Sequence, residues 1–218
     1  VDELKLMSQY GIGYMQLTVM KADKLVEKHL AKNGLADTKV SWARLGAGAA
    51  ANDALLAGGL HMAAGGTGPA FILWDRTRGN VGVHGISALS SMPNLLVTRN
   101  PNIKAIKDFT EKDRIAMAGA GSSVQTIYLQ MAVAREFGPE NFKKLNPLMV
   151  NLPHPEGLRA MLSGSGEIQS QFTSPPFQNQ ALEQGARVVL NSYDIMGGPN
   201  TFLMVWTTSK FRDENPKS

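Results

Sequence analysis

RIAMAGAGSSVQTIYLQMAVAREFG, residues 114–138, predicts a short apolar strand, a turn of small residues and a long helix that ends at Gly138. Units of this kind recur along the chain. Strand patterns such as KVSWARL (39–45) and PLMVNL (147–152) alternate with helical patterns such as 17–34 and 156–164. The alternation predicts an α/β fold with mostly parallel sheets flanked by helices.

The turn in this unit has the setting of a nucleotide-binding loop but lacks its residues. Val124 stands where a dinucleotide fingerprint has its third glycine, and PLMVNLP (147–153) ends without the acidic residue that would bind a ribose. The turn also lacks the GK[ST] of a phosphate-binding P-loop. These departures argue against a nucleotide and against a cofactor of that kind.

The same turn precedes a helix, and the first N–H groups of a helix have no partner within it. The predicted ligand residues here are Gly121, Ser122, Ser123 and Val124. Two adjacent serines, where one would cap the helix, favour a site for an anion or polar group. The alternative is a plain N-cap with no ligand.

Three further loops follow the same logic. QYGIGYM (9–15) lets the backbone approach a ligand closely and offers Tyr10 and Tyr14 for contact, unless it is a turn with core tyrosines. GGTGP (65–69) places the Thr67 hydroxyl between a strand and a helix. SALSSMP (87–93) supplies Ser87 in a predicted loop, where serines are more often merely solvated.

Composition excludes several classes of function. The 218 residues carry a net charge of +4 without any basic run, so no nucleic-acid surface is predicted. The absence of cysteine and of close histidine pairs argues against a metal site. No apolar stretch reaches the length of a membrane span, so a soluble chain is expected. No catalytic base or nucleophile pair can be placed, and His61 is interpreted as a core histidine, so we expect binding without catalysis.

Two stretches share a layout. ALLAGGLHMAAGGTGPAF (54–71) and AMLSGSGEIQSQFTSPPF (160–177) each run from a helix end through a short strand to a proline and a phenylalanine. Any two strand–helix–strand units look broadly alike, which is one explanation. The other is a pair of similar lobes with a ligand cleft between them.

The order of these motifs resembles a known family. The first strand is followed by GxGY, then by ALLAGGLHMAAGGTGP, LLVTRNPNIKAIKDF, IAMAGAGSSVQ, EGLRAMLSG and SKFRDENP, over nearly the whole chain. This looks like the periplasmic solute-binding proteins of ABC importers, in the nitrate, sulfonate and taurine branch that also includes thiamine-precursor binders.

The resemblance implies a two-lobed periplasmic-binding-protein fold (type II), each lobe a mixed sheet flanked by helices. Lobe 1 would comprise 1–97 and 195–218, and lobe 2 would comprise 98–194. The hinge motion of the family would close the lobes on the ligand. The implied ligand loops contain Gln9, Tyr10, Gly11, Thr67, Gly68, Pro69, Ser87, Gly121, Ser122, Ser123, Val124, Ser174 and Pro175.

The chain also departs from the family. Many members have Asp where this chain has His61 and Gln169. The cysteine-rich motif of the thiamine-precursor synthases is missing, which argues against the related enzyme. Family members continue beyond FRDENPKS with helices that pack on lobe 1, so we expect that lobe to lack its C-terminal part and to expose apolar surface.

The sequence therefore predicts an extracytoplasmic, periplasmic substrate-binding protein, not an enzyme, that captures a small sulfonate-, nitrate- or carboxylate-like solute. Its expected partners are this ligand and the transmembrane subunits of an ABC permease, with the protein itself a monomer. No cofactor is expected. The opening VDELKLM is consistent with the removal of a signal peptide. The alternative is the ligand-sensing domain of a regulator with the same fold.

Overall fold

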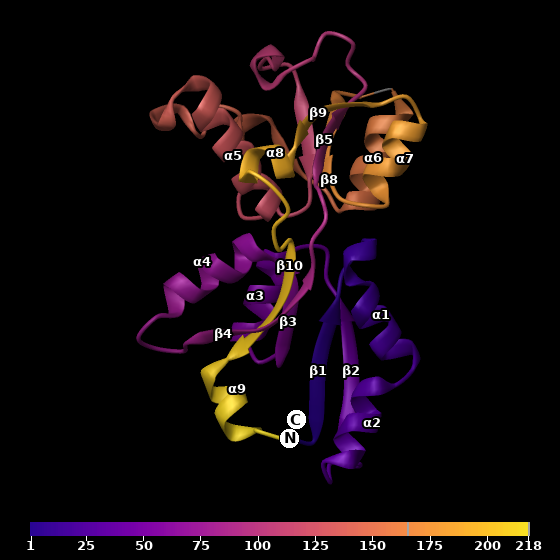
Figure 1. Cartoon of the computed structure of the whole chain (residues 1–218), viewed down its shortest axis with the longest axis vertical. Coiled ribbons are helices and arrows are strands. Elements are labelled where there is room, and N and C mark those ends of the chain that lie inside the picture. The colour runs from indigo at the N-terminus through magenta and orange to yellow at the C-terminus, as the bar shows by residue number, and fades with distance from the viewer. Residues whose placement is uncertain (165, 218) are drawn as a thin grey trace. The chain divides into compact units, whose positions relative to one another are not determined.

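The structure is a computed structural model that describes residues 1–164 and 166–217, and the chain forms two compact units (Figure 1). Unit 1 contains residues 1–9, 13–90 and 201–217, and unit 2 contains residues 10–12 and 91–200. The change of unit falls between Ser90 and Ser91, whereas the sequence placed it at 97/98. It falls between Asn200 and Thr201 on the return, whereas the sequence placed it at 194/195. The identification of these units as ligand-binding lobes stays a prediction.

Unit 1 contains a parallel strand pair and an antiparallel sheet. Strands β1 (Glu3–Ser8) and β2 (Lys39–Arg44) run parallel in register, with Leu4 opposite Val40 and Leu6 opposite Trp42. The second sheet has the order β3-β10-β4, from β3 (Met62–Gly66), β10 (Leu203–Thr208) and β4 (Val83–Ser90). Because β10 arrives from the far end of the chain and is antiparallel to both neighbours, the expectation of mostly parallel sheets is wrong here.

The helices of unit 1 follow the predicted pattern with one break. They are α1 (Met15–Ala22), α2 (Leu25–Lys32), α3 (Gly48–Leu56), α4 (Thr67–Thr77) and α9 (Ser209–Glu214), and a short 3₁₀ turn, Ile12–Tyr14, precedes α1. The helix expected over 17–34 is two helices, because Lys24 adopts a left-handed conformation with φ of 50°. Leu30 of α2 and Phe211 of α9 pack with β1 in one core cluster.

Unit 2 is built on a five-stranded mixed sheet of order β7-β6-β8-β5-β9. Its strands are β5 (Leu95–Thr98), β6 (Arg114–Met117), β7 (Met149–Asn151), β8 (Ile168–Thr173) and β9 (Arg187–Asn191). Strand β6 is parallel to β7 and β8, whereas β5 is antiparallel to β8 and β9. The mixed sheet implied by the family resemblance is therefore confirmed in this unit.

The helices of unit 2 are α5 (Val124–Phe137), α6 (His154–Ser163), α7 (Phe177–Glu183) and the short α8 (Ser192–Met196). Helices α6 and α7 pack on β5 through Leu158, Met161, Ala181 and Val97. A 3₁₀ turn, Ile106–Asp108, lies between β5 and β6, and the Asp108 carboxylate accepts hydrogen bonds from the amides of Lys104 and Ala105. Two more 3₁₀ turns, Pro139–Asn141 and Asn146–Leu148, connect α5 to β7.

Candidate ligand-binding turns

Two of the predicted ligand turns lie at one edge of the sheet in unit 2. Strands β6 and β8 are parallel neighbours, and each is followed by a turn that leads into a helix. The turn after β6 contains Gly121–Val124, and the turn after β8 contains Ser174 and Pro175. Because the carboxyl ends of parallel strands meet at the same sheet edge, the topology places these two turns on one side of the unit.

The turn before α5 uses Ser123 as a helix cap. The Ser123 hydroxyl accepts a hydrogen bond from the Thr126 amide at 3.2 Å, and the amides of Ser122 and Ser123 both donate to the Gly119 carbonyl, at 3.0 and 2.8 Å. Ser123 is buried, whereas Ser122 is half-buried and Gly121 is exposed. The capping role left open by the sequence therefore belongs to Ser123, and Ser122 is the serine that solvent reaches.

The helix end keeps two amides without a partner. Among residues 1–164 and 166–217, none accepts a hydrogen bond from the amide of Val124 or of Gln125, the first two residues of α5. The next two amides donate to Ser123, Thr126 to its hydroxyl and Ile127 to its carbonyl. The two unpaired donors and the positive end of the helix dipole are the groups that would bind an anion here.

This turn is anchored by residues that the sequence analysis missed. The Gly119 amide donates to Asn151 Oδ1 at 2.9 Å, so the last residue of β7 fixes the start of the turn. The Gly121 amide donates to Thr126 Oγ1 at 3.0 Å, which ties the turn to the first turn of α5. Asn151 is the one polar residue of the PLMVNL strand pattern, and its place near the end of that pattern was the available signal.

The loop of the first strand meets the turn after β8. The Ile12 amide donates to the Pro175 carbonyl at 3.1 Å. Gly11 has φ of +116°, and a Cβ atom built on it would lie 3.3 Å from the Pro175 oxygen and 3.5 Å from Ser174 Oγ. Position 11 therefore requires glycine, both for its backbone conformation and for the close approach of Ser174–Pro175.

The two tyrosines of that loop have different environments. Tyr10 is 38% exposed. Tyr14 is only 6% exposed, and burial raises the pKa of its hydroxyl, so it stays protonated. The structure favours the core role for Tyr14 that the sequence left open.

In unit 1 the predicted residues Gln9, Thr67, Gly68 and Pro69 gather where β3 ends and α4 begins. Gln9 Nε2 donates to the Ala64 carbonyl at 2.8 Å, and the Thr67 amide donates to the Phe202 carbonyl at 3.1 Å. Asn52 of α3 donates to the Pro69 carbonyl at 2.9 Å. These bonds fix the start of α4 between β3, β10 and α3.

Ser87 does not lie in a loop, which corrects the sequence analysis. It is inside strand β4, opposite Val205 of β10, and its hydroxyl donates to the neighbouring Ala88 carbonyl at 2.9 Å. Pairing with the distant β10 decides the conformation of Ser87, which a local pattern does not show.

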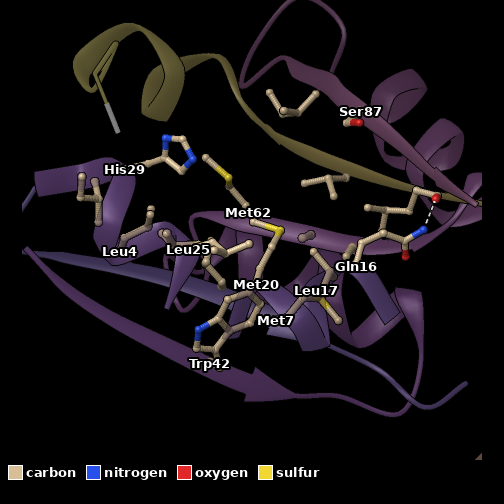
Figure 2. A pocket seen from close by; sticks show the side chains of 18 of the residues that line it. Leu4, Met7, Gln16, Leu17, Met20, Leu25, His29, Trp42, Met62 and Ser87 are labelled. Atoms are coloured by element: carbon tan, nitrogen blue, oxygen red, sulfur yellow. Dashed lines mark hydrogen bonds between the residues drawn. The ribbon is translucent and has the colours of Figure 1, made fainter. Parts of the chain in front are cut away.

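Ser87 instead lines an apolar cavity of about 800 Å³ in unit 1 (Figure 2). The cavity lies among β1, β2, helices α1 and α2, and the β3-β10-β4 sheet. Its larger labelled lining residues are Leu4, Met7, Leu17, Met20, Leu25, Trp42 and Met62. Gln9, Thr67, Gly68 and Pro69 do not line it, so this cavity is separate from the predicted turns.

The predicted turns are electrically neutral in their side chains. Stretches 9–12, 66–69, 118–124 and 174–176 contain no Lys, Arg, Asp or Glu. Arg44, at the end of β2, lies opposite Ser8 of β1, the residue before the first of these stretches. An anion at these turns would therefore be held by backbone amides, hydroxyls and helix dipoles rather than by an ion pair.

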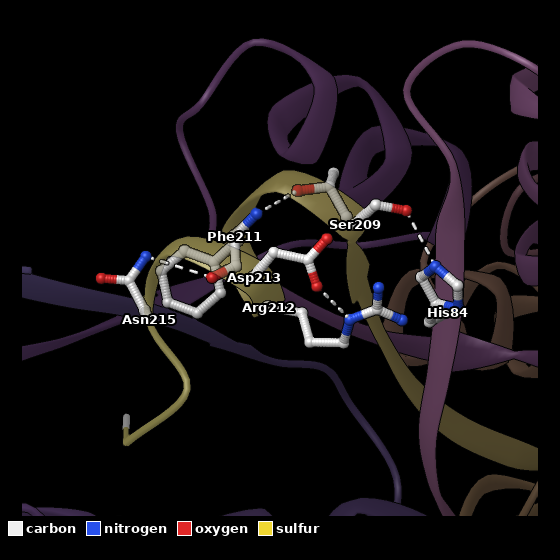
Figure 3. A network of polar contacts seen from close by, with 7 residues as sticks. His84, Ser209, Phe211, Arg212, Asp213 and Asn215 are labelled. Atoms are coloured by element: carbon white, nitrogen blue, oxygen red, sulfur yellow. Dashed lines mark hydrogen bonds and ion pairs between the residues drawn. The ribbon is translucent and has the colours of Figure 1, made fainter.

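Three histidines of the chain have structural partners. His154 is buried, its Nδ1 lies 2.9 Å from Thr173 Oγ1, and burial lowers its pKa to about 4. His61 Nδ1 accepts from the Lys5 amide at 3.2 Å. His84 Nε2 lies 2.8 Å from Ser209 Oγ at the start of α9, while Asp213 pairs with Arg212 (Figure 3). The Ser122 hydroxyl donates to the Gly119 carbonyl at 3.4 Å.

Within the described residues no group of three or more His, Cys, Asp or Glu side chains could hold a metal ion. None of the helices in 1–164 and 166–217 is long and apolar enough to cross a membrane.

Comparison with known proteins identifies the class of fold. The alkanesulfonate-binding protein SsuA of Xanthomonas axonopodis pv. citri, bound to MOPS, is 17% identical with a TM-score of 0.73, over 100% of this chain and 69% of that one. The periplasmic nitrate-binding protein NrtA of Synechocystis PCC 6803 is 15% identical with a TM-score of 0.71, over 100% of this chain and 58% of that one. A binding protein component of an ABC phosphonate transporter from Pseudomonas aeruginosa is 13% identical with a TM-score of 0.62, over 99% of this chain and 72% of that one.

The fold is therefore that of the periplasmic binding proteins, which confirms the predicted fold class. The structures that share it include the sulfonate- and nitrate-binding proteins that the sequence resembles. No protein-family model matches the sequence, and no curated protein matches it.

Proposed function

We propose that this chain is the extracytoplasmic substrate-binding protein of an ABC importer and that it captures a small anionic solute. The fold supports this, because the similar structures include proteins described as binding alkanesulfonates and nitrate. The proposed ligand is a sulfonate, nitrate or carboxylate. The proposed partner is the permease of the importer, and the proposed state is a periplasmic monomer that does not transform its ligand.

The observation that carries the proposal is the start of α5. The amides of Val124 and Gln125 have no acceptor among the described residues, and the half-buried Ser122 lies beside them. The neutral side chains of the turn suit a ligand that must be released again. An anion held by dipoles is bound through several modest hydrogen bonds rather than one strong ion pair.

The proposal is tested first by a thermal-shift screen with MOPS, nitrate, phosphonates, dicarboxylates, aromatic acids and pyrimidines. A ligand that binds the folded chain raises its melting temperature as the ligand concentration exceeds Kd. We expect a sulfonate, nitrate or carboxylate to give the largest shift. A shift only with uncharged pyrimidines would contradict the proposed ligand class.

The position of the site is tested with a double variant, Ser122→Ala with Ser123→Ala. We expect its affinity for the best anion to fall at least tenfold by calorimetry. Thr208→Ala is the matched control, because Thr208 Oγ1 caps α9 through the Phe211 amide at 3.2 Å in unit 1. Unchanged affinity in the double variant would show that the start of α5 is not the site.

A further inference from the structure

Two residues near the start of α5, Gln125 and Tyr128, contact the segments where the chain passes between its units. We define the first crossing segment as 91–95 and the second as 192–200, since the chain changes unit at Ser90/Ser91 and Asn200/Thr201. Gln125 and Tyr128 are three residues apart on α5, which puts them on one face of the helix. Both are buried, at 4% and 2% exposure.

Gln125 holds the first crossing segment. Its Nε2 donates to Asn94 Oδ1 at 2.8 Å, and Asn94 is fully buried. The Asn94 backbone is bonded in turn to Ser192, whose hydroxyl accepts from the Asn94 amide at 2.9 Å and whose amide donates to the Asn94 carbonyl at 2.9 Å. One amide side chain of α5 therefore reaches both crossing segments through Asn94.

Tyr128 holds the second crossing segment directly. Its hydroxyl accepts from Asn200 Nδ2 at 2.9 Å, at the last residue before the chain returns to unit 1. Burial raises the pKa of Tyr128, so the hydroxyl remains protonated and neutral in the physiological range.

The turn after β8 is connected to the same place. Gln178 lies in the first turn of α7, after Ser174 and Pro175, and is 4% exposed. Its Oε1 accepts from the Leu95 amide and its Nε2 donates to the Pro93 carbonyl, each at 3.1 Å. Both candidate turns of unit 2 are therefore followed, within one helical turn, by a buried glutamine that bonds to the first crossing segment. This glutamine is Gln125 after the turn that precedes α5 and Gln178 after the turn that follows β8.

From these contacts we propose that Gln125 and Tyr128 are positioning residues that couple the ligand turn at the start of α5 to both crossing segments. The inference rests on the proposed function for the ligand, but the bonds themselves are tested without one. Gln125 has its backbone amide at the candidate anion site and its side chain on Asn94. A displacement of the first turn of α5 is therefore passed to the crossing segment through a single residue. Buried bonds of this kind have few alternative partners, so a shift at one end moves the other.

The first test is hydrogen exchange of the ligand-free chain, measured by mass spectrometry. Gln125→Met keeps the side-chain size and removes the donor to Asn94. We expect exchange in the peptides covering 91–95 and 192–200 to become roughly five- to tenfold faster, as the loss of one buried hydrogen bond predicts. Gln130→Met is the matched control, because Gln130 lies on the same helix and donates to Asn146 Oδ1 at 3.2 Å, away from both crossings.

Tyr128→Phe is the second variant and removes only a hydroxyl. We expect faster exchange in 192–200, with 91–95 changed much less. If both variants leave the crossing segments no faster than in Gln130→Met, the coupling does not exist. If Gln125→Met does not fold, Tyr128→Phe alone decides the result for the second crossing segment.

The ligand-dependent test uses saturating MOPS. In the unaltered chain we expect slower exchange at 119–124 and in both crossing segments. In Gln125→Met the slowing at 119–124 persists and the slowing at 91–95 is lost. Persistence of both would overturn the coupling. If MOPS slows exchange nowhere in the unaltered chain, MOPS is not a ligand, while the ligand-free comparison still decides whether Gln125 and Tyr128 hold the crossings.

Discussion

The imidazole ring of His61 lies against the phenyl ring of Phe211, with ring centroids 4.5 Å apart and planes 13° from parallel. His61 forms two hydrogen bonds with Lys5 of β1: its amide donates to the Lys5 carbonyl, and its Nδ1 accepts from the Lys5 amide. Phe211 belongs to α9, near the end of the described chain. The ring pair therefore fastens the last helix of unit 1 to its first strand.

We expect Phe211→Ala to lower the free energy of unfolding of unit 1 by about 3 kcal/mol, because a buried phenyl ring in the cluster with Leu4 and Leu6 is replaced by a cavity. Urea denaturation followed by tryptophan fluorescence measures the loss, since Trp42 packs against the same cluster. Lys210→Ala, on the exposed side of α9, is the control and should change stability by less than about 0.5 kcal/mol.

His154 predicts a dependence of stability on pH. Burial lowers its pKa from 6.5 to about 4, so the folded chain holds the imidazole neutral while the unfolded chain protonates it more readily. The stabilisation is complete above pH 6.5 and is lost as the pH falls toward 4, by roughly 3 kcal/mol in total.

Urea denaturation at a series of pH values between 6.5 and 4 measures this loss. His154→Gln should flatten the dependence, whereas His29→Gln, on the exposed side of α2, should keep it. An identical pH profile in His154→Gln and the unaltered chain would show that another group titrates.

The two adjacent serines before α5 should have different effects on stability and on anion binding when each is changed alone. Ser123→Ala removes the cap of α5 and should cost about 1 kcal/mol of stability. Ser122→Ala leaves that cap in place, so we expect nearly unchanged stability and weaker binding of the anion found in the screen. Thermal denaturation and calorimetry on the same samples distinguish the two effects. The reverse assignment, with stability lost in Ser122→Ala, would contradict the capping geometry.

Gly48 is expected to be sensitive to the smallest substitution. A Cβ atom on Gly48 would lie 2.6 Å from Pro69 Cγ, so alanine forces α3 and the start of α4 apart. Although alanine favours helices, Gly48→Ala should lose about 1–3 kcal/mol. Ala50→Ser, on an exposed position of the same helix, serves as the control in urea denaturation. A stabilised Gly48→Ala chain would show that Pro69 does not pack against α3.

Local patterns were sufficient for most of the elements and for the turn before α5. Strand alternation and helical spacing depend on near neighbours, so the start of α5 after two serines could be predicted closely. Ser87 was misplaced because its conformation depends on pairing with β10, which lies more than a hundred residues away in the chain. Gln125 was missed for the same reason, since its partner Asn94 is brought near only by the fold.

The break at Lys24 shows another limit of patterns. Apolar spacing continues through 17–34, yet the backbone turns left-handed at Lys24 and starts a second helix. A left-handed conformation at a non-glycine residue has no clear sequence signal. The antiparallel direction of β10 was not predicted, because strand direction is decided by the path of the whole chain.

The central position of β10 has a consequence for the synthesis of the protein. Strands β3 and β4 leave the ribosome before β10, which follows the whole 91–200 segment of unit 2. Unit 2 can complete its own sheet while β3 and β4 still lack the strand that joins them. During that interval the nascent chain presents two unpaired strand edges, which favour aggregation. Holding chaperones should therefore associate with nascent chains that already include Asn200, the end of unit 2, but not yet all of β10. They should release the chain once β10 has been translated.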